Sequence, residues 1–231
     1  MLLASAICSC SEKQPETSEP MITKTEIQVE NGHFTPEIMH RLGKVGDVQV
    51  SPNHAKILYG VTYTSIEQNK GNRELYLMNV DGSENVKITN TPKSESNARW
   101  INDSQIIYMR SGKLYTATIE GSTLKNEKEV AGAEGMEGFE LSPAGDKLMF
   151  IKSVKAAQKP TDVYADLDKS SGRTYEDLMY RHWDHFVEEV PHTYVATFDG
   201  KQVSGITDIL VGDTASPETD TKKFELPTLP F

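Results

Sequence analysis

The densest group of titratable side chains lies toward the C-terminal end of the sequence. It comprises His182, Asp184, His185, Glu188 and Glu189. On a helix, residues three apart share a face, so the two histidines could bind one metal ion. However, the string His-Trp-Asp-His differs from the H-E-x-x-H arrangement of zinc enzymes, and no third ligand is evident. We therefore expect no metal site in this chain.

The element expected to position this group is an amphipathic helix over residues 175 to 187. Four apolar side chains recur there at helical spacing, namely Leu178, Met179, Trp183 and Phe186. These side chains would pack the helix down and leave the charged ones as its solvated face. That solvated face is the alternative to any chemical role for the group.

Motifs that carry chemistry elsewhere are missing from the sequence. It has no G-x-S-x-G nucleophile elbow, no Gly-rich phosphate loop and no G-x-x-x-x-G-K string. Its 24 basic and 34 acidic residues give a net charge of −10, which disfavours nucleic-acid binding. We therefore expect no catalytic residue, no cofactor and no nucleic-acid partner.

The chain is organised as a repeat of four short β-strands. In the first copy, residues 47 to 90, apolar and polar residues alternate at period two around a Ser-Pro-Asn turn at 51 to 53. The aromatic residue near the end of the second strand recurs as Tyr59, Tyr108 and Phe150, in steps of 49 (108 − 59) and 42 (150 − 108) residues. A four-stranded unit of ~40 to 50 residues is the period of a β-propeller blade.

The third strand of each copy ends on an acidic residue and a glycine, a pair suited to a hairpin turn: Asp81-Gly82, Glu120-Gly121 and Asp199-Gly200. We therefore expect an all-β fold, a partial β-propeller of about three four-stranded antiparallel blades at residues 45–91, 95–131 and 135–210. A helical insertion at 151–192 would interrupt the third blade. The alternative is a generic antiparallel sheet with similar turns.

Two strings place this repeat near known families. S-P-x-x-x-K-I begins at Ser51 and S-P-x-G-D-K-L at Ser142, and a later strand in each repeat ends on the acidic residue and glycine. They resemble the repeats of Tol-associated periplasmic propellers and of the propeller domain in the prolyl oligopeptidase family. Residues 34–52 and 177–184 further resemble bacterial dipeptidyl and acylaminoacyl peptidases of that family. The resemblance covers about Phe34 to Leu210.

This resemblance implies a propeller that caps a C-terminal α/β-hydrolase domain and filters peptide substrates. The family's catalytic Ser, Asp and His lie in that hydrolase domain, and nothing in this chain aligns with them. The chain would then be a non-catalytic part of a secreted serine peptidase. The alternative is a stand-alone Tol-type propeller that binds a protein or a ligand.

The resemblance also implies a role for Glu188 and Glu189. In the aminodipeptidase branch of the family, paired glutamates on a propeller insertion bind the α-ammonium of the substrate through charge-assisted hydrogen bonds. Here the pair precedes the third strand of its own blade, whereas in that branch it precedes a new S-P hairpin. We keep both the substrate-binding role and the solvated-face interpretation open.

The N-terminus resembles a lipoprotein signal. Residues 7 to 10, Ile-Cys-Ser-Cys, have the spacing of a lipoprotein cleavage box, and 11–20 form a polar tether. No Lys or Arg precedes Cys10, so the basic part of a signal peptide is missing and an ordinary secretory remnant is the alternative. We expect lipidation at Cys10, a membrane tether and a periplasmic or outer-membrane location in a Gram-negative bacterium.

The remaining segments flank the repeat. Residues 1–20 would be the signal and tether, and 21–44 a lead-in with a short helix whose N-cap is Thr35 and whose first residue is Pro36. Residues 211–231 are polar and Pro-rich and would link to a missing fourth blade.

Overall fold

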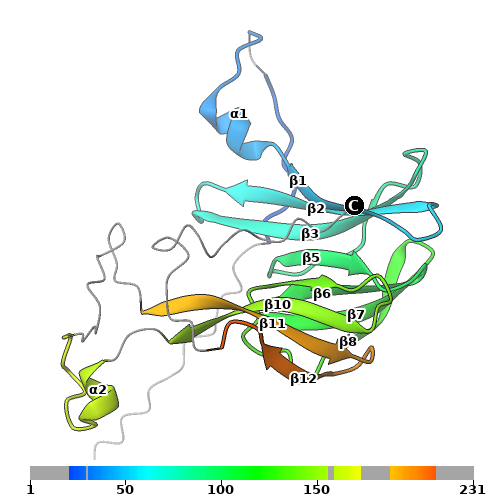
Figure 1. Ribbon diagram of the computed structural model, residues 1–231. Coiled ribbons are helices and arrows are strands. Elements are labelled where there is room, and N and C mark those ends of the chain that lie inside the picture. Colours follow the sequence, from blue (N-terminus) through cyan, green and yellow to red (C-terminus); the bar gives the residue numbers. More distant parts are fainter. Residues whose placement is uncertain (1–20, 30, 156–158, 173–187, 212–231) are drawn as a thin grey trace, which may run out of the picture.

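The structure is a computed structural model that describes residues 21–29, 31–155, 159–172 and 188–211. The predicted helix at 175–187, most of the titratable group and Cys10 lie outside these residues. Three four-stranded antiparallel sheets follow one another along the molecule (Figure 1). They form an unclosed series, which confirms the partial β-propeller predicted from the repeat.

Sheet 1 has its strands in chain order: β1 (Lys44–Val50), β2 (Lys56–Ser65), β3 (Lys70–Asn79) and β4 (Val86–Lys87). The predicted Ser-Pro turn joins β1 to β2, and the Ser51 side chain holds it. Ser51 Oγ accepts a hydrogen bond from Lys56 N at 2.9 Å and donates one to Asn53 Oδ1 at 2.8 Å. Ser142 makes the equivalent bonds to Lys147 N and Asp146, so the repeated serine has a structural cause.

Sheet 2 and sheet 3 repeat this order. Sheet 2 contains β5 (Glu95–Trp100), β6 (Gln105–Arg110), β7 (Lys113–Glu120) and β8 (Thr123–Glu129). Sheet 3 contains β9 (Gly138–Leu141), β10 (Lys147–Lys155), β11 (Glu189–Phe198) and β12 (Val203–Asp208). In both sheets each strand pairs with the next along the chain, which is the simplest connection for antiparallel strands.

The interruption of sheet 3 is shorter than the predicted 151–192. β10 continues to Lys155 and β11 begins at Glu189, with Val154 opposite Val190. Val190 is buried, so apolar packing extends the ladder into the stretch that the sequence indicated as insertion. Between these strands the described residues contain one short helix, α2 (Pro160–Val163), so the described helical content of the insertion is small.

The recurring aromatic residues lie at the same position in each sheet. Each one stacks on an aromatic residue of the following strand: Tyr59 on Tyr76, Tyr108 on Tyr115, and Phe150 on Tyr194, with ring centroids 5.6, 6.0 and 5.3 Å apart. Because cross-strand neighbours share a face, these pairs fix which face of each sheet turns toward the preceding sheet.

The hydrophobic core lies between consecutive sheets. Leu58, Leu75 and Leu77 of sheet 1 pack against the face of sheet 2 that carries Ile106 and Tyr108. The opposite face of sheet 2 packs against sheet 3, and this second cluster includes Ile107, Met109, Leu148 and Phe150. Alternation along a strand supplies both clusters, since successive side chains point to opposite faces. Sheet 2 is therefore covered on both sides.

Helix α1 (Pro36–Arg41) precedes sheet 1 and lies beyond its outer end (Figure 1). As predicted, Thr35 is its N-cap, and Thr35 Oγ1 accepts a hydrogen bond from Ile38 N at 3.4 Å. Pro36 fits the first turn because the N–H that proline lacks has no partner there in any helix. Ile38 is the buried residue of this helix, while Met39 and Leu42 remain exposed.

Candidate functional site

The first strands of the three sheets, β1, β5 and β9, lie next to one another. Hydrogen bonds join them across the gaps between sheets. Asn97 N donates to Asp47 Oδ2 at 3.3 Å, and Asn97 Nδ2 donates to Phe139 O at 2.5 Å. Asp47 and Asn97 have positive φ, 52° and 53°, and each lies at a bulge in its strand. Asp and Asn tolerate this conformation better than most residues, so these bulges aim polar side chains at the neighbouring sheet.

Three polar residues occupy one equivalent position on these strands. Gln49, Arg99 and Glu140 lie opposite Leu58, Ile107 and Met149, each of which immediately precedes a recurring aromatic residue. The side chains of Arg99 and Glu140 meet across the gap between sheets 2 and 3. Arg99 Nη2 donates to Glu140 Oε1 at 2.6 Å, and Arg99 Nε donates to Oε2 at 3.0 Å.

The Arg99–Glu140 pair is bidentate, which is the geometry in which a guanidinium holds a carboxylate most strongly. These hydrogen bonds raise the pKa of Arg99 above its ordinary value, against the opposing effect of partial burial. Arg99 also donates through Nη1 to Ala98 O at 3.0 Å. The arginine is thus held rigidly, whereas about half of the Glu140 side chain is exposed, at 56%.

A hollow of about 380 Å³ opens beside this pair. All three sheets contribute to its lining, which includes Gln49, Pro52, Arg99, Trp100, Glu140 and Pro143. Trp100 Nε1 donates to Gln49 O at 3.3 Å and so closes the gap between sheets 1 and 2. The guanidinium, the carboxylate and the indole N–H on its wall all have hydrogen-bond partners within the chain.

The two residues predicted to bind a substrate amine, Glu188 and Glu189, both lie within the described part of the chain. Glu188 precedes β11, and its Oε2 lies 2.6 Å from Lys159 Nζ. Glu189 is the first residue of β11, is exposed, and lies opposite Lys155. One member of the pair therefore already contacts a primary ammonium, which is the group that the predicted role requires. The role itself stays a prediction.

His182, Asp184 and His185 lie outside the described residues, as does Cys10, so the predictions made for them stay predictions. In the described ranges, no three His, Cys, Asp or Glu side chains converge as they would around a metal ion. No helix within those ranges is long and apolar enough to cross a membrane.

Known proteins resemble this chain in sequence. No family model matches the chain. The sequence is 33% identical over 184 residues to dipeptidyl-peptidase 5 of Porphyromonas gingivalis, across 78% of this chain and 27% of that protein. It is 31% identical over 194 residues to dipeptidyl-peptidase 5 of Porphyromonas endodontalis, across 82% of this chain and 28% of that protein. The chain thus spans little more than a quarter of the length of these relatives.

Among solved structures, the fold is similar to acylaminoacyl peptidase of Pyrococcus horikoshii, with a TM-score of 0.52 and 17% identity over 74% of this chain and 25% of that one. Unclosed four-stranded sheets packed face to face define the chain as a partial β-propeller. More particularly, it is a homologue of dipeptidyl-peptidase 5, and the match fits the N-terminal propeller portion of the prolyl oligopeptidase family. This confirms the resemblance carried by the S-P repeats.

The contact between Arg99 and Glu140 escaped the sequence analysis. These residues are 41 positions apart and have unrelated side chains. A weak signal was nevertheless present. Gln49 and Glu140 each lie 10 residues before their recurring aromatic residue (59 − 49 and 150 − 140) and Arg99 lies 9 before its own (108 − 99), so a one-residue gap is needed to align the three. These residues lie on β1, β5 and β9, which we call the inner strands because consecutive sheets lie next to one another there.

Proposed function

We propose that these residues form the non-catalytic, substrate-gating β-propeller portion of a secreted serine peptidase of the prolyl oligopeptidase family. In this proposal a C-terminal α/β-hydrolase domain outside this chain hydrolyses the peptide bond. The observation that carries the proposal is the 33% identity to a dipeptidyl-peptidase over 78% of the chain. The hollow beside Arg99 and Glu140 supports it, because it lies where the inner strands of three consecutive sheets meet.

Gating predicts an effect of opening the hollow. In the peptidase that carries these residues, the double substitution Arg99→Ala and Glu140→Ala removes the bidentate link between β5 and β9. We expect kcat/KM for a long peptide to rise by up to about tenfold, equivalent to about 1.4 kcal/mol of barrier. We expect little change for a dipeptidyl p-nitroanilide, which is small enough to pass either way. Steady-state kinetics with both substrates measure the difference.

Lys113 and Glu129 provide the matched control. Their ion pair has an N–O distance of 2.9 Å, is about half exposed, and joins β7 to β8 away from the inner strands. Replacing both by alanine should leave both rate constants unchanged. Equal changes for the long and the short substrate in the Arg99/Glu140 variant would contradict gating and would indicate a structural role for the pair.

We further propose that Glu188 and Glu189 bind the free amine of a peptide substrate. Both carboxylates stand together at the start of β11, and a substrate amine would displace the Lys159 ammonium that now pairs with Glu188. In the complete peptidase, Glu188→Gln or Glu189→Gln should raise KM for a free-amino dipeptidyl substrate by about 10- to 100-fold, the value of a hydrogen bond to a charged group. An N-blocked substrate should be spared. Equal effects on both substrates would instead favour the solvated-face interpretation.

A further inference from the structure

Two carboxyl groups are buried where sheet 1 meets sheet 2. Glu74 of β3 is 2% exposed, and Glu95, the first residue of β5, is 0% exposed. The segment that connects β4 to β5 runs between them and supplies Thr89 and Thr91 as partners. Buried carboxylates are costly unless they are paired and hydrogen-bonded, so the partners of each group decide its charge.

Glu74 is well supplied with donors. Its Oε2 accepts from Thr89 Oγ1 at 2.8 Å, and its Oε1 accepts from Asn72 Nδ2 and from Thr91 N, both at 3.2 Å. The Lys87 ammonium lies 3.9 Å from Oε1. Glu74 thus has three hydrogen-bond donors and a nearby cation.

Glu95 is poorly supplied by comparison. Its Oε1 lies 2.7 Å from Thr91 Oγ1, whose single proton can go either to Glu95 or to Lys93 O at 2.6 Å. Arg110 Nη1 lies 3.6 Å from Oε1, which is too far for a good hydrogen bond. Its Oε2 has no hydrogen-bond partner. The Thr89 hydroxyl cannot supply one, since its single proton is directed to Glu74.

Arg110 does not compensate for this missing donor, because its guanidinium is engaged elsewhere. Its Nη2 donates to Glu127 Oε1 at 2.5 Å and its Nη1 donates to Glu127 Oε2 at 3.1 Å. Tyr108 also donates its hydroxyl proton to Glu127. Arg110 is thus bidentate with Glu127 on β8, and the nitrogen that approaches Glu95, Nη1, is one of the two that already donate to Glu127.

Glu95 therefore bears the full cost of burying a carboxylate. Its neighbours are the negatively charged Glu74 and the Arg110 guanidinium, which is mainly bound to Glu127. Burial is the largest cause that raises the pKa of Glu95, and the charge of Glu74 adds to it. Hydrogen bonds from threonine and the charge of Arg110 act in the opposite direction without cancelling the shift. When Glu95 is ionised, Oε2 is an acceptor that no donor reaches. A proton on Oε2 would make it a donor, with the oxygens of Glu74 and Thr89 beside it as acceptors.

We propose that Glu95 takes up a proton when sheet 1 packs on sheet 2, so that this junction is a proton-sensitive contact that is stronger in acid than at neutral pH. The charged groups around Glu95 are Glu74 on β3, Lys87 on β4, Arg110 on β6 and Glu127 on β8. Glu74 and Arg110 act on Glu95 directly, and Lys87 lies beside Glu74. Glu127 acts indirectly, because it binds the Arg110 guanidinium.

The sign follows from linkage. A carboxyl whose pKa is raised on folding contributes stability that is fully present below its unfolded value, near 4.5, and is lost as pH rises through the folded value. Glutamine has the shape of a protonated glutamate and carries no charge at any pH. Glu95→Gln should therefore match the wild type in acid and exceed it at pH values above the folded pKa.

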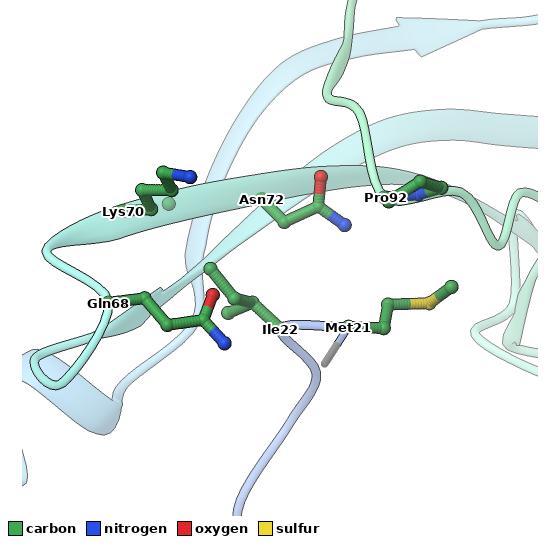
Figure 2. Close-up of a pocket in the computed structure, with 7 residues that line it drawn as sticks. Met21, Ile22, Gln68, Lys70, Asn72 and Pro92 are labelled. Carbon is green, nitrogen blue, oxygen red and sulfur yellow. The ribbon is translucent and has the colours of Figure 1, made fainter. Parts of the chain in front are cut away.

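A small hollow lies beside Asn72, which donates a hydrogen bond to Glu74. It has a volume of about 60 Å³, enough for an ordered water, and Asn72 forms part of its wall together with Met21 and Ile22 (Figure 2). Asn72 Oδ1 has no protein partner, although its Nδ2 donates to Glu74.

The test is urea unfolding of the 231-residue chain at about pH 3.5 and pH 8, with the wild type and Glu95→Gln compared at each pH. We expect the midpoint of the variant to exceed that of the wild type at pH 8 and the two midpoints to coincide at about pH 3.5, below the unfolded value. Glu127→Gln is the control of opposite sign. Hydrogen bonds from Arg110 lower the pKa of Glu127, so its contribution is present above the unfolded value and lost as pH falls. This control should have the lower midpoint at pH 8.

A second measurement keeps the proposal testable if a variant fails to fold. Carboxyl ¹³C NMR of the wild type should give Glu95 an apparent pKa above that of ordinary glutamates. A lower midpoint for Glu95→Gln at pH 8, or a Glu95 pKa at or below the ordinary value, would overturn the proposal and assign Glu95 to an ion pair with Arg110.

Discussion

Leu148→Ala is expected to lower the free energy of unfolding by about 2 to 5 kcal/mol. Leu148 lies on β10, is fully buried and belongs to the cluster between sheets 2 and 3. Removal of the Leu148 side chain leaves a cavity between two sheets. Antiparallel ladders fix the backbone within each sheet, so the neighbouring side chains cannot collapse into the cavity. Urea unfolding followed by circular dichroism measures the loss.

Met149 is the matched control, because it is adjacent, similar in size and on the opposite face of the same strand. Met149 is 41% exposed. It lies on the face of sheet 3 against which, among the described residues, no further sheet packs. Met149→Ala should cost about 1 kcal/mol or less, because little apolar area returns to water. In a protein where another sheet packs on this face, the same substitution should cost more. Similar losses for the two variants in this chain would mean that the order of the sheets is wrong.

Most of the fold was readable from the sequence because the signals are local. Alternation at period two, Ser-Pro turns and the spacing of Tyr59, Tyr108 and Phe150 fix the strands and the faces that they bury. Other elements lack such signals. β8 reads Thr-Leu-Lys-Asn-Glu-Lys-Glu, almost without apolar residues, because it is an outer strand with one neighbour. The pairing of Val154 with Val190 depends on residues 36 positions apart (190 − 154), and no local pattern shows it.

The candidate site was less predictable than the fold. The group at 182 to 189 stood out because its titratable residues lie close together in sequence, and its predicted role stays a prediction. Arg99 and Glu140 come together only through the packing of β5 beside β9, and the bulges at Asp47 and Asn97 orient the strands there. Asp and Asn are common in ordinary turns, so their residue types alone do not indicate a bulge.

Gly132→Ala is expected to destabilise the chain by roughly 2 to 5 kcal/mol, from two separate causes. Gly132 has a φ of 77°, a conformation that costs an L-residue about 1 to 2 kcal/mol. A Cβ at this position would also lie 2.5 Å from the Val203 carbonyl oxygen, a backbone atom that cannot rotate away. Forcing that contact costs typically about 1 to 3 kcal/mol more.

Gly82→Ala separates the two causes, because Gly82 has a similar φ of 84° but has no atom within 4 Å of the added Cβ. It should therefore show the backbone cost alone, and the difference between the two urea midpoints measures the contact. That contact matters because the segment around Gly132 ties sheet 2 to sheet 3: Val203 N donates to Ala131 O at 2.8 Å, and Ala131 N donates to Lys201 O at 3.1 Å. If the two variants lose equal stability, β12 can yield to the added methyl group, and this tie contributes little to holding the third sheet in place.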